Sequence, residues 1–116
     1  ALESIFGNLI TNAINYTPEG GTIQVRVDLE GLNLRVQVQD SGFGIEARYL
    51  ERIFERFFRV KNDRTRFITG TGLGLPIVKG LVDSLGGLIR VESTPDVGST
   101  FTVLLPVRGQ EQGPGQ

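Results

Sequence analysis

Residues 23–40 read I-Q-V-R-V-D-L-E-G-L-N-L-R-V-Q-V-Q-D, and this stretch decides the fold. Apolar residues occupy every second position from Ile23 to Leu29 and again from Leu32 to Val38, on either side of Glu30-Gly31. Alternation with a period of two is typical of strands that bury one face. Two such runs around a short turn predict a β-hairpin with one buried face.

The segments before and after the hairpin have helical spacing instead. Apolar residues recur at this spacing from Leu2 to Ile14 and predict a helix that ends at about Tyr16, where T-P-E-G-G follows. A second run, from Leu75 to Leu85, predicts an amphipathic helix that ends at the following G-G pair.

Four further segments complete the pattern. A short helix is expected from about Glu46 to Phe54, and residues 60–70 have neither period and are expected to form a mobile loop. Strands are expected at 88–94 and 99–106. The tail 109–116 has no apolar residue, so we expect it to be disordered. Segregated helices and antiparallel strands predict an α+β fold of two layers.

Composition narrows the class of protein. The 116 residues are enough for one domain, and the net charge of −1 argues against a nucleic-acid partner. The chain has no cysteine, which excludes disulfides and thiolate metal sites and fits a reducing compartment. Because no run of 18 apolar residues occurs, we expect no direct membrane contact. We expect a cytoplasmic location, within a full-length protein that could be membrane-anchored, and a monomeric isolated domain.

Four short motifs follow one another along the chain: N-L-I-T-N-A-I-N-Y-T at 8–17, D-S-G-F-G at 40–44, F-E-R-F-F-R at 54–59 and G-T-G-L-G-L at 70–75. Each is weak alone, because glycine-rich strings are common. Together they resemble the N box, first glycine box, F box and second glycine box of the catalytic domain of sensor histidine kinases. The resemblance implies a Bergerat ATP-binding fold, a two-layer α/β sandwich whose mixed sheet is covered by helices on one face.

The resemblance covers nearly the whole chain. It implies a catalytic domain over residues 1–108 that lacks a preceding strand and helix of the family pattern. In this family the phosphorylated histidine lies on a separate helical dimerisation domain, and this chain contains no histidine. The implied partners are therefore that domain of the same full-length kinase and, through it, a response regulator.

The first predicted helix places Asn8, Asn12 and Asn15 on one face, where a solvated helix would favour Lys or Glu. Alternatively, this stripe only bonds neighbouring loops. The resemblance implies that Asn12 gives its side-chain oxygen to Mg²⁺, a hard cation that also uses water and phosphate oxygens. Asn8 would orient phosphates or a metal-bound water. Asn15 departs from the family, which commonly has Lys there, and Tyr16 would either contact the nucleotide or pack half-buried.

Asp40 ends an apolar strand, where burying a carboxylate is costly. A purely structural alternative is that Asp40 and the following glycines form an Asx-type turn. The resemblance implies that Asp40 accepts a hydrogen bond from the exocyclic amine of adenine, and that Gly42 and Gly44 let the base approach. A hydroxyl of G-S-T-F at 98–101, which we assign to Thr100, would support Asp40.

The motif G-T-G-L-G-L opens a helix, where free N–H groups can bind phosphate. Arg56 would reach the γ-phosphate or the acceptor domain, unless it is simply solvated or ion-paired. By packing, Phe54, Phe57 and Phe58 would anchor the base of the loop at 60–70, which would act as a lid over the nucleotide. The expected nucleotide-binding residues are Asn8, Asn12, Asn15, Tyr16, Asp40, Gly42, Gly44, Ile45, Gly70, Thr71, Gly72, Leu73, Gly74, Leu75 and Thr100, with Asn8, Asn12 and Arg56 catalytic and Asn12 the metal ligand.

Several functions fit these motifs. The leading one is transfer of the γ-phosphoryl group of Mg²⁺–ATP to a histidine of another domain. An ATP-hydrolysing conformational clamp of the same superfamily would carry a Glu as general base at the position of Asn8, and an amide cannot abstract a proton from water. A serine-directed anti-sigma kinase and a non-catalytic nucleotide-sensing module remain as alternatives.

Overall fold

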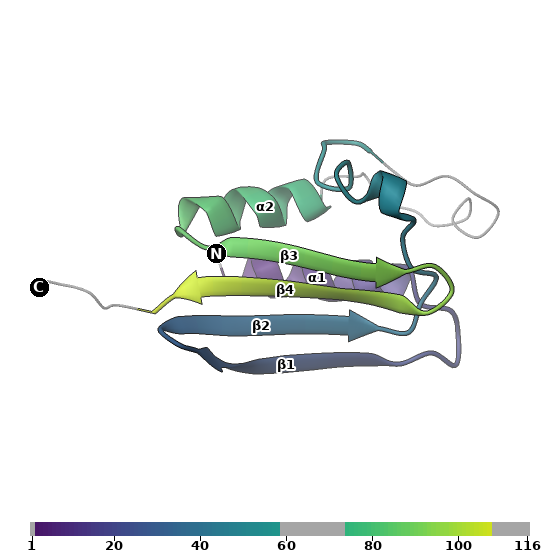
Figure 1. Cartoon of the computed structure of the whole chain (residues 1–116), viewed down its shortest axis with the longest axis horizontal. Helices are drawn as coiled ribbons and strands as arrows, with labels where there is room; N and C mark the ends of the chain where they lie inside the picture. Colours follow the sequence, from purple (N-terminus) through teal and green to yellow (C-terminus); the bar gives the residue numbers. More distant parts are fainter. Residues whose placement is uncertain (1, 59–73, 108–116) are drawn as a thin grey trace, which may run out of the picture.

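The computed structural model describes residues 2–58 and 74–107, in which two helices cover one face of a four-stranded sheet (Figure 1). The helices are α1 (Leu2–Asn15) and α2 (Gly74–Ser84), and a short 3-10 helix, η1, spans Ala47–Tyr49. The strands are β1 (Ile23–Glu30), β2 (Asn33–Asp40), β3 (Leu88–Thr94) and β4 (Gly98–Pro106). The predicted two-layer α+β fold is confirmed, and each strand lies within two residues of its predicted range.

The sheet has the order β1-β2-β4-β3, and each neighbouring pair is antiparallel. The mixed sheet expected from the resemblance is thus not found among these four strands. β2 and β3 do run in the same direction, as a connection through α2 favours (Figure 1). However, β4 is inserted between them, so no two parallel strands are neighbours.

The core lies between the sheet and the helices. In the register of β2 and β4, Val36 lies opposite Val103 and Val38 lies opposite Phe101, and all four side chains are buried. The helices bury one face each against them, because their apolar residues recur at helical spacing. The buried helical residues are Ile5, Leu9 and Ala13 of α1 and Val78 and Val82 of α2.

The expectation of a buried face for the whole hairpin is only half right. On β1, the exposed fractions of Val25, Val27 and Leu29 are 47%, 51% and 65%. These residues face the helix layer, because Val27 lies opposite the buried Val36 in the register. Since α1 lies over β2 and packs against α2, neither helix covers β1. This row of three β1 side chains, the β1 apolar row, is apolar by sequence and uncovered in the described structure.

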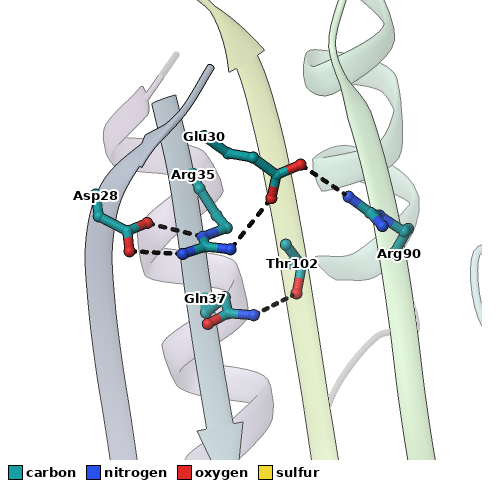
Figure 2. Close-up of polar contacts among 6 residues, drawn as sticks. All are labelled: Asp28, Glu30, Arg35, Gln37, Arg90 and Thr102. Atoms are coloured by element: carbon teal, nitrogen blue, oxygen red, sulfur yellow. Dashed lines mark hydrogen bonds and ion pairs between the residues drawn. The ribbon is translucent and has the colours of Figure 1, made fainter. Parts of the chain in front are cut away.

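The opposite face of the sheet carries a polar network (Figure 2). The Arg35 guanidinium donates two hydrogen bonds to the carboxylate of Asp28, at 2.8 and 2.6 Å, and one to Glu30 at 3.1 Å. Arg90 on β3 extends the network to Glu30 at 3.8 Å. The hydrogen bond from Arg35 lowers the pKa of Asp28. Because exposed ion pairs stabilise little, this network contributes little to the stability of the fold.

The segment after β2 differs from its prediction. Only η1 is helical there, and residues 50–57 continue as turns. Its backbone hydrogen bonds join residues three apart, as in Tyr49 N–H to Glu46 and Leu50 N–H to Ala47. Such bonds hold single turns rather than a continuous α-helix. The partly or fully buried side chains of Ile53, Phe54 and Phe58 fix the segment by packing against the core instead.

The predicted loop at 60–70 and the tail at 109–116 lie outside the described residues. Over the described ranges, no helix is long and apolar enough to span a bilayer.

Candidate functional site

The C-terminal end of α1 contacts the first glycine motif. The backbone carbonyl of Tyr16 accepts a hydrogen bond from the Phe43 N–H at 3.0 Å. Gly42 lies so close that an added Cβ atom would collide with this same carbonyl oxygen. Only glycine therefore lets the chain pass here, which explains the first glycine of D-S-G-F-G in physical terms.

Asp40 lies at the end of β2 and is 6% exposed. Its Oδ1 accepts a hydrogen bond from the Gly42 N–H at 2.9 Å, and the backbone amide of Ser99 also hydrogen-bonds to the carboxylate. Burial raises the pKa of Asp40, and the two backbone hydrogen bonds only partly oppose that effect. Within residues 2–58 and 74–107, it is the one acidic side chain that is buried. This position suits a ligand that brings hydrogen-bond donors.

The turn between β3 and β4 closes over the same loop. An added Cβ atom on Gly44, whose φ is 72°, would collide with the Thr94 carbonyl. One on Gly98, whose φ is 142°, would collide with the carbonyl oxygen of Asp40. Both glycines combine a left-handed backbone with a close approach, so they fix how the two loops meet. Gly98 was not among the predicted site residues.

The hydroxyl beside Asp40 belongs to Ser99, and the assignment to Thr100 was wrong. In the register of β2 and β4, Asp40 lies opposite Ser99 and Gln39 lies opposite Thr100. Neighbouring residues of a strand point to opposite faces. Thr100 therefore points away from the helix layer, whereas Ser99 lies on the same face as the buried Phe101.

Ser93 is a second residue that the sequence reasoning missed. It lies opposite Ser99 in the register of β3 and β4, and the two hydroxyl oxygens are 2.7 Å apart. The Ile45 N–H, just after the first glycine motif, donates to Ser93 Oγ at 2.7 Å. Strand parity could have found both serines, because each lies in step with the apolar residues of its own strand.

The amide face of α1 meets the start of α2. Asn8 Nδ2 donates to the Ser4 carbonyl at 2.8 Å, and an added Cβ atom on Gly74 would lie 3.3 Å from Asn8 Oδ1. Asn12 is partly buried and Asn15 is exposed. The N-terminal end of α2 thus lies beside the predicted phosphate-binding residues of α1. Of the second glycine motif, Gly74 and Leu75 are described, and Leu75 packs against the core. Gly70, Thr71, Gly72 and Leu73 lie outside the described residues.

The F-box prediction is correct for two of its three phenylalanines. Phe54 and Phe58 pack against the core, and the Arg52 guanidinium lies 4.5 Å from the centre of the Phe58 ring. Phe57, however, is 69% exposed and has a φ of 65°. Its turn directs the side chain outward, so Phe57 does not anchor the segment. Arg56 is exposed, and its predicted role stays a prediction.

The chemistry of the donors limits which metal could bind. In the part of the chain that the structure describes, no three His, Cys, Asp or Glu side chains are grouped to hold an ion. The metal-facing candidates on α1 are neutral amide oxygens. Two amides alone are a weak site, but they fit Mg²⁺ if the other ligands are water and phosphate oxygens of a bound nucleotide.

Two histidine kinases are similar to this chain in sequence. The sensor-like histidine kinase SenX3 of Mycobacterium tuberculosis is 45% identical over 105 residues, which are 90% of this chain and 26% of the relative. The sensor histidine kinase WalK of Bacillus subtilis is 39% identical over 113 residues, 96% of this chain and 18% of the relative. The chain thus spans about a quarter or less of the length of these relatives.

Solved structures of histidine kinases have a similar fold. The mycobacterial sensor histidine kinase MprB matches with a TM-score of 0.78 and 32% identity, over 89% of this chain and 70% of that one. Full-length ShkA, solved in complex with AMPPNP, matches with a TM-score of 0.76 and 33% identity, over 90% of this chain and 21% of that one. The fold is therefore the Bergerat fold of these ATPase domains. The family model for histidine kinase-, DNA gyrase B- and HSP90-like ATPases matches residues 1–109. The chain belongs to this ATPase family.

Proposed function

We propose that this chain binds Mg²⁺–ATP and transfers the γ-phosphoryl group to a histidine on a separate dimerisation domain. One observation carries the proposal: a single helix, α1, contacts both halves of the candidate site. Its end holds the loop that follows Asp40 through the Tyr16 carbonyl, and its Asn8 lies against Gly74 at the start of α2. Family membership supports ATP as the ligand.

The Asp40 end suits the adenine base. A buried carboxylate offers acceptors only, and the exocyclic amine of adenine brings donors, whereas guanine would place a carbonyl oxygen there. Gly42 and Gly44 leave no side chain between the loop and its neighbours. The related kinase ShkA was solved in complex with AMPPNP, an ATP analogue, which supports an adenine nucleotide as the ligand here.

The other end suits the triphosphate. The N-terminal end of α2 would present backbone N–H groups to phosphate oxygens. Asn12 would hold Mg²⁺, which when bound would neutralise charge on the phosphates. Asn8 would orient the phosphates or a metal-bound water. Since Asn8 cannot act as a general base, it would position the nucleotide and would not activate a water for hydrolysis.

The nucleophile must come from another domain, because this chain has no histidine. In the proposed step, an imidazole nitrogen forms a bond to the γ-phosphorus while the bond from that phosphorus to the bridging oxygen breaks. The electron pair leaves with ADP, and the ring, which becomes positively charged as the new bond forms, releases its N–H proton to water. Positioning and charge stabilisation dominate this chemistry, and α1 with α2 can supply both. The phosphorylated domain would then serve a response regulator.

Radiolabelled ATP tests the proposal. We expect label on protein only when a histidine-bearing dimerisation domain is added, and the label should be labile in acid and stable in base, as a phosphoramidate is. Asn12→Ala should abolish labelling. Asn33→Ala, at the opposite end of β2 from Asp40, is the matched control and should label normally.

Three results would contradict the proposal. Rapid ATP hydrolysis by this chain alone, with no label on any added domain, would favour the clamp ATPase. Acid-stable label on a serine would favour the serine-directed kinase. Tight binding of Mg²⁺–ATP with no acceptor labelled at all would favour a nucleotide-sensing module.

A further inference from the structure

Ser93 makes three hydrogen-bonding contacts through one hydroxyl group. Its Oγ accepts from the Ile45 N–H at 2.7 Å, donates to the Gly98 carbonyl at 3.1 Å and lies 2.7 Å from Ser99 Oγ. These partners come from the loop after the first glycine motif and from the start of β4. One partly buried side chain on β3 therefore joins both segments that surround Asp40.

The hydroxyl of Ser93 has one hydrogen and two lone pairs. Because its hydrogen goes to the Gly98 carbonyl, the contact with Ser99 requires that Ser99 be the donor. The two lone pairs of Ser93 then receive the Ile45 N–H and the Ser99 O–H. This is the one assignment that satisfies all three contacts together, and it turns the Ser99 hydrogen toward Ser93.

The direction of that hydrogen matters because of where Ser99 lies. Ser99 is the register partner of Asp40 and shares its face of the sheet. Directly paired residues of neighbouring strands have Cβ atoms about 5 Å apart. With its hydrogen held by Ser93, the Ser99 oxygen presents lone pairs on the side of Asp40. The floor of the site then offers acceptors from both residues.

We propose that Ser93 is a positioning residue for purine recognition: by holding the hydrogen of Ser99, it keeps the site beside Asp40 acceptor-only and so selects a base with an exocyclic amine. This inference rests on the proposed function and deepens it. A freed Ser99 hydroxyl would be able to donate to the Asp40 carboxylate, or to a carbonyl oxygen on the base. Either change would weaken the preference for an amine.

Titration with ATP and with inosine triphosphate, in which a carbonyl oxygen replaces the exocyclic amine, tests this directly. We expect Ser93→Ala to lower the ratio of the two dissociation constants, inosine triphosphate over ATP, by about 3- to 10-fold, the range of one net hydrogen bond. Ser93→Thr keeps the hydroxyl and should have the same ratio as the wild type. If Ser93→Ala does not fold, Ser93→Cys is the substitute: its side chain is nearly the same size but its sulfur is only a weak acceptor, so the ratio should fall in the same direction by a smaller factor.

Two further measurements separate positioning from general weakening. In the nucleotide-free protein, Ser93→Ala should speed hydrogen exchange of the Ile45 amide. In a Ser99→Ala background, the same substitution should leave the nucleotide ratio unchanged, because there is no Ser99 hydrogen left to turn. Thr102→Val is the matched control: Thr102 is buried on the opposite face of β4 and bonds Gln37 at 3.1 Å (Figure 2). It should leave the ratio unchanged.

The outcomes are distinguishable. If the wild-type chain binds neither nucleotide, the proposed function fails. If it binds ATP selectively and Ser93→Ala keeps both the ratio and the Ile45 exchange rate, the role of Ser93 is refuted while the proposed function stands. An equal effect of Ser93→Ala in the Ser99→Ala background would also refute it.

Discussion

The side-chain oxygen of Asn8 faces the backbone of Gly74, and an added Cβ atom on Gly74 would lie 3.3 Å from it. These residues belong to motifs that lie far apart in the chain. A contact of 3.3 Å is tight, so any side chain at Gly74 must move the amide of Asn8. The substitution Gly74→Ala, which adds one methyl group, can therefore test the phosphate end of the candidate site.

Gly74→Ala should weaken Mg²⁺–ATP binding while the fold stays intact. Alanine favours helix over glycine, so stability should not fall. The displaced Asn8 amide should cost about one hydrogen bond to the nucleotide, or roughly 3- to 10-fold in affinity. Calorimetric titration and thermal melting measure the two effects. Gly80→Ala on the same helix meets no atom within 4 Å and is the control. Equal affinity for both variants would contradict a phosphate role for this contact.

Gly98→Ala should destabilise the fold strongly. The new Cβ atom would collide with the Asp40 carbonyl oxygen, and the φ of 142° is unfavourable for any residue with a side chain. We expect a loss of at least ~2 kcal/mol in the free energy of unfolding. Gly31→Ala separates the two causes, since Gly31 has a φ of 62° and open space around it. It should lose about 1 kcal/mol. Similar denaturation midpoints for the two variants would argue against the collision.

Asp40→Asn should stabilise the nucleotide-free protein at pH 7 while lowering ATP affinity by at least ~10-fold, as expected for a lost charged hydrogen bond. Burial raises the pKa of Asp40 in the folded state above its ordinary 3.8. Its contribution to stability is therefore fully present below that value and is lost as the pH rises through the raised pKa. Thermal melts from pH 7 down to pH 4 should show the wild type gaining on Asp40→Asn. A constant difference across that range would contradict the pKa shift.

Val27 and Val36 form a register pair that offers a matched test of burial. Val36 is fully buried and Val27 is 51% exposed. Threonine has nearly the shape of valine, so the substitution mainly adds a hydroxyl. Val36→Thr should cost about 1–3 kcal/mol, because the hydroxyl is buried without a partner. Val27→Thr should change stability by less than ~0.5 kcal/mol. A large loss for Val27→Thr would mean that the β1 apolar row is covered in solution.

Local patterns predicted the elements well. The alternation from Ile23 to Val38 fixed the hairpin, and helical spacing with a following glycine pair fixed α2 to within a residue or two. These signals depend on neighbours in sequence alone. The segment after Ile45 was harder to predict. It forms separate turns whose apolar side chains pack against the core, and the spacing of apolar residues in the sequence does not distinguish such turns from a short α-helix.

Properties that depend on distant partners could not be predicted. Nothing near Val25 in sequence says that α1 lies over β2 rather than over β1. Phe57 carries an apolar side chain, but its left-handed backbone turns it outward. The sequence could have favoured Ser99 over Thr100, because Ser99 is two residues from Phe101 and so lies on the same face of the strand. Only the register of β2 and β4, however, shows that Asp40 lies on this face too.

The insertion of β4 between β2 and β3 also orders events during synthesis. The β1–β2 hairpin can form as soon as its two strands have left the ribosome. β2 and β3 cannot be joined until β4 has emerged, and the Gln37–Thr102 contact bridges 65 residues. Until then both strands have unpaired edges, which are prone to wrong pairing. A nascent chain ending at Thr94 would carry most of the sheet and both helices, yet its Asp40 would have no Ser99 beside it.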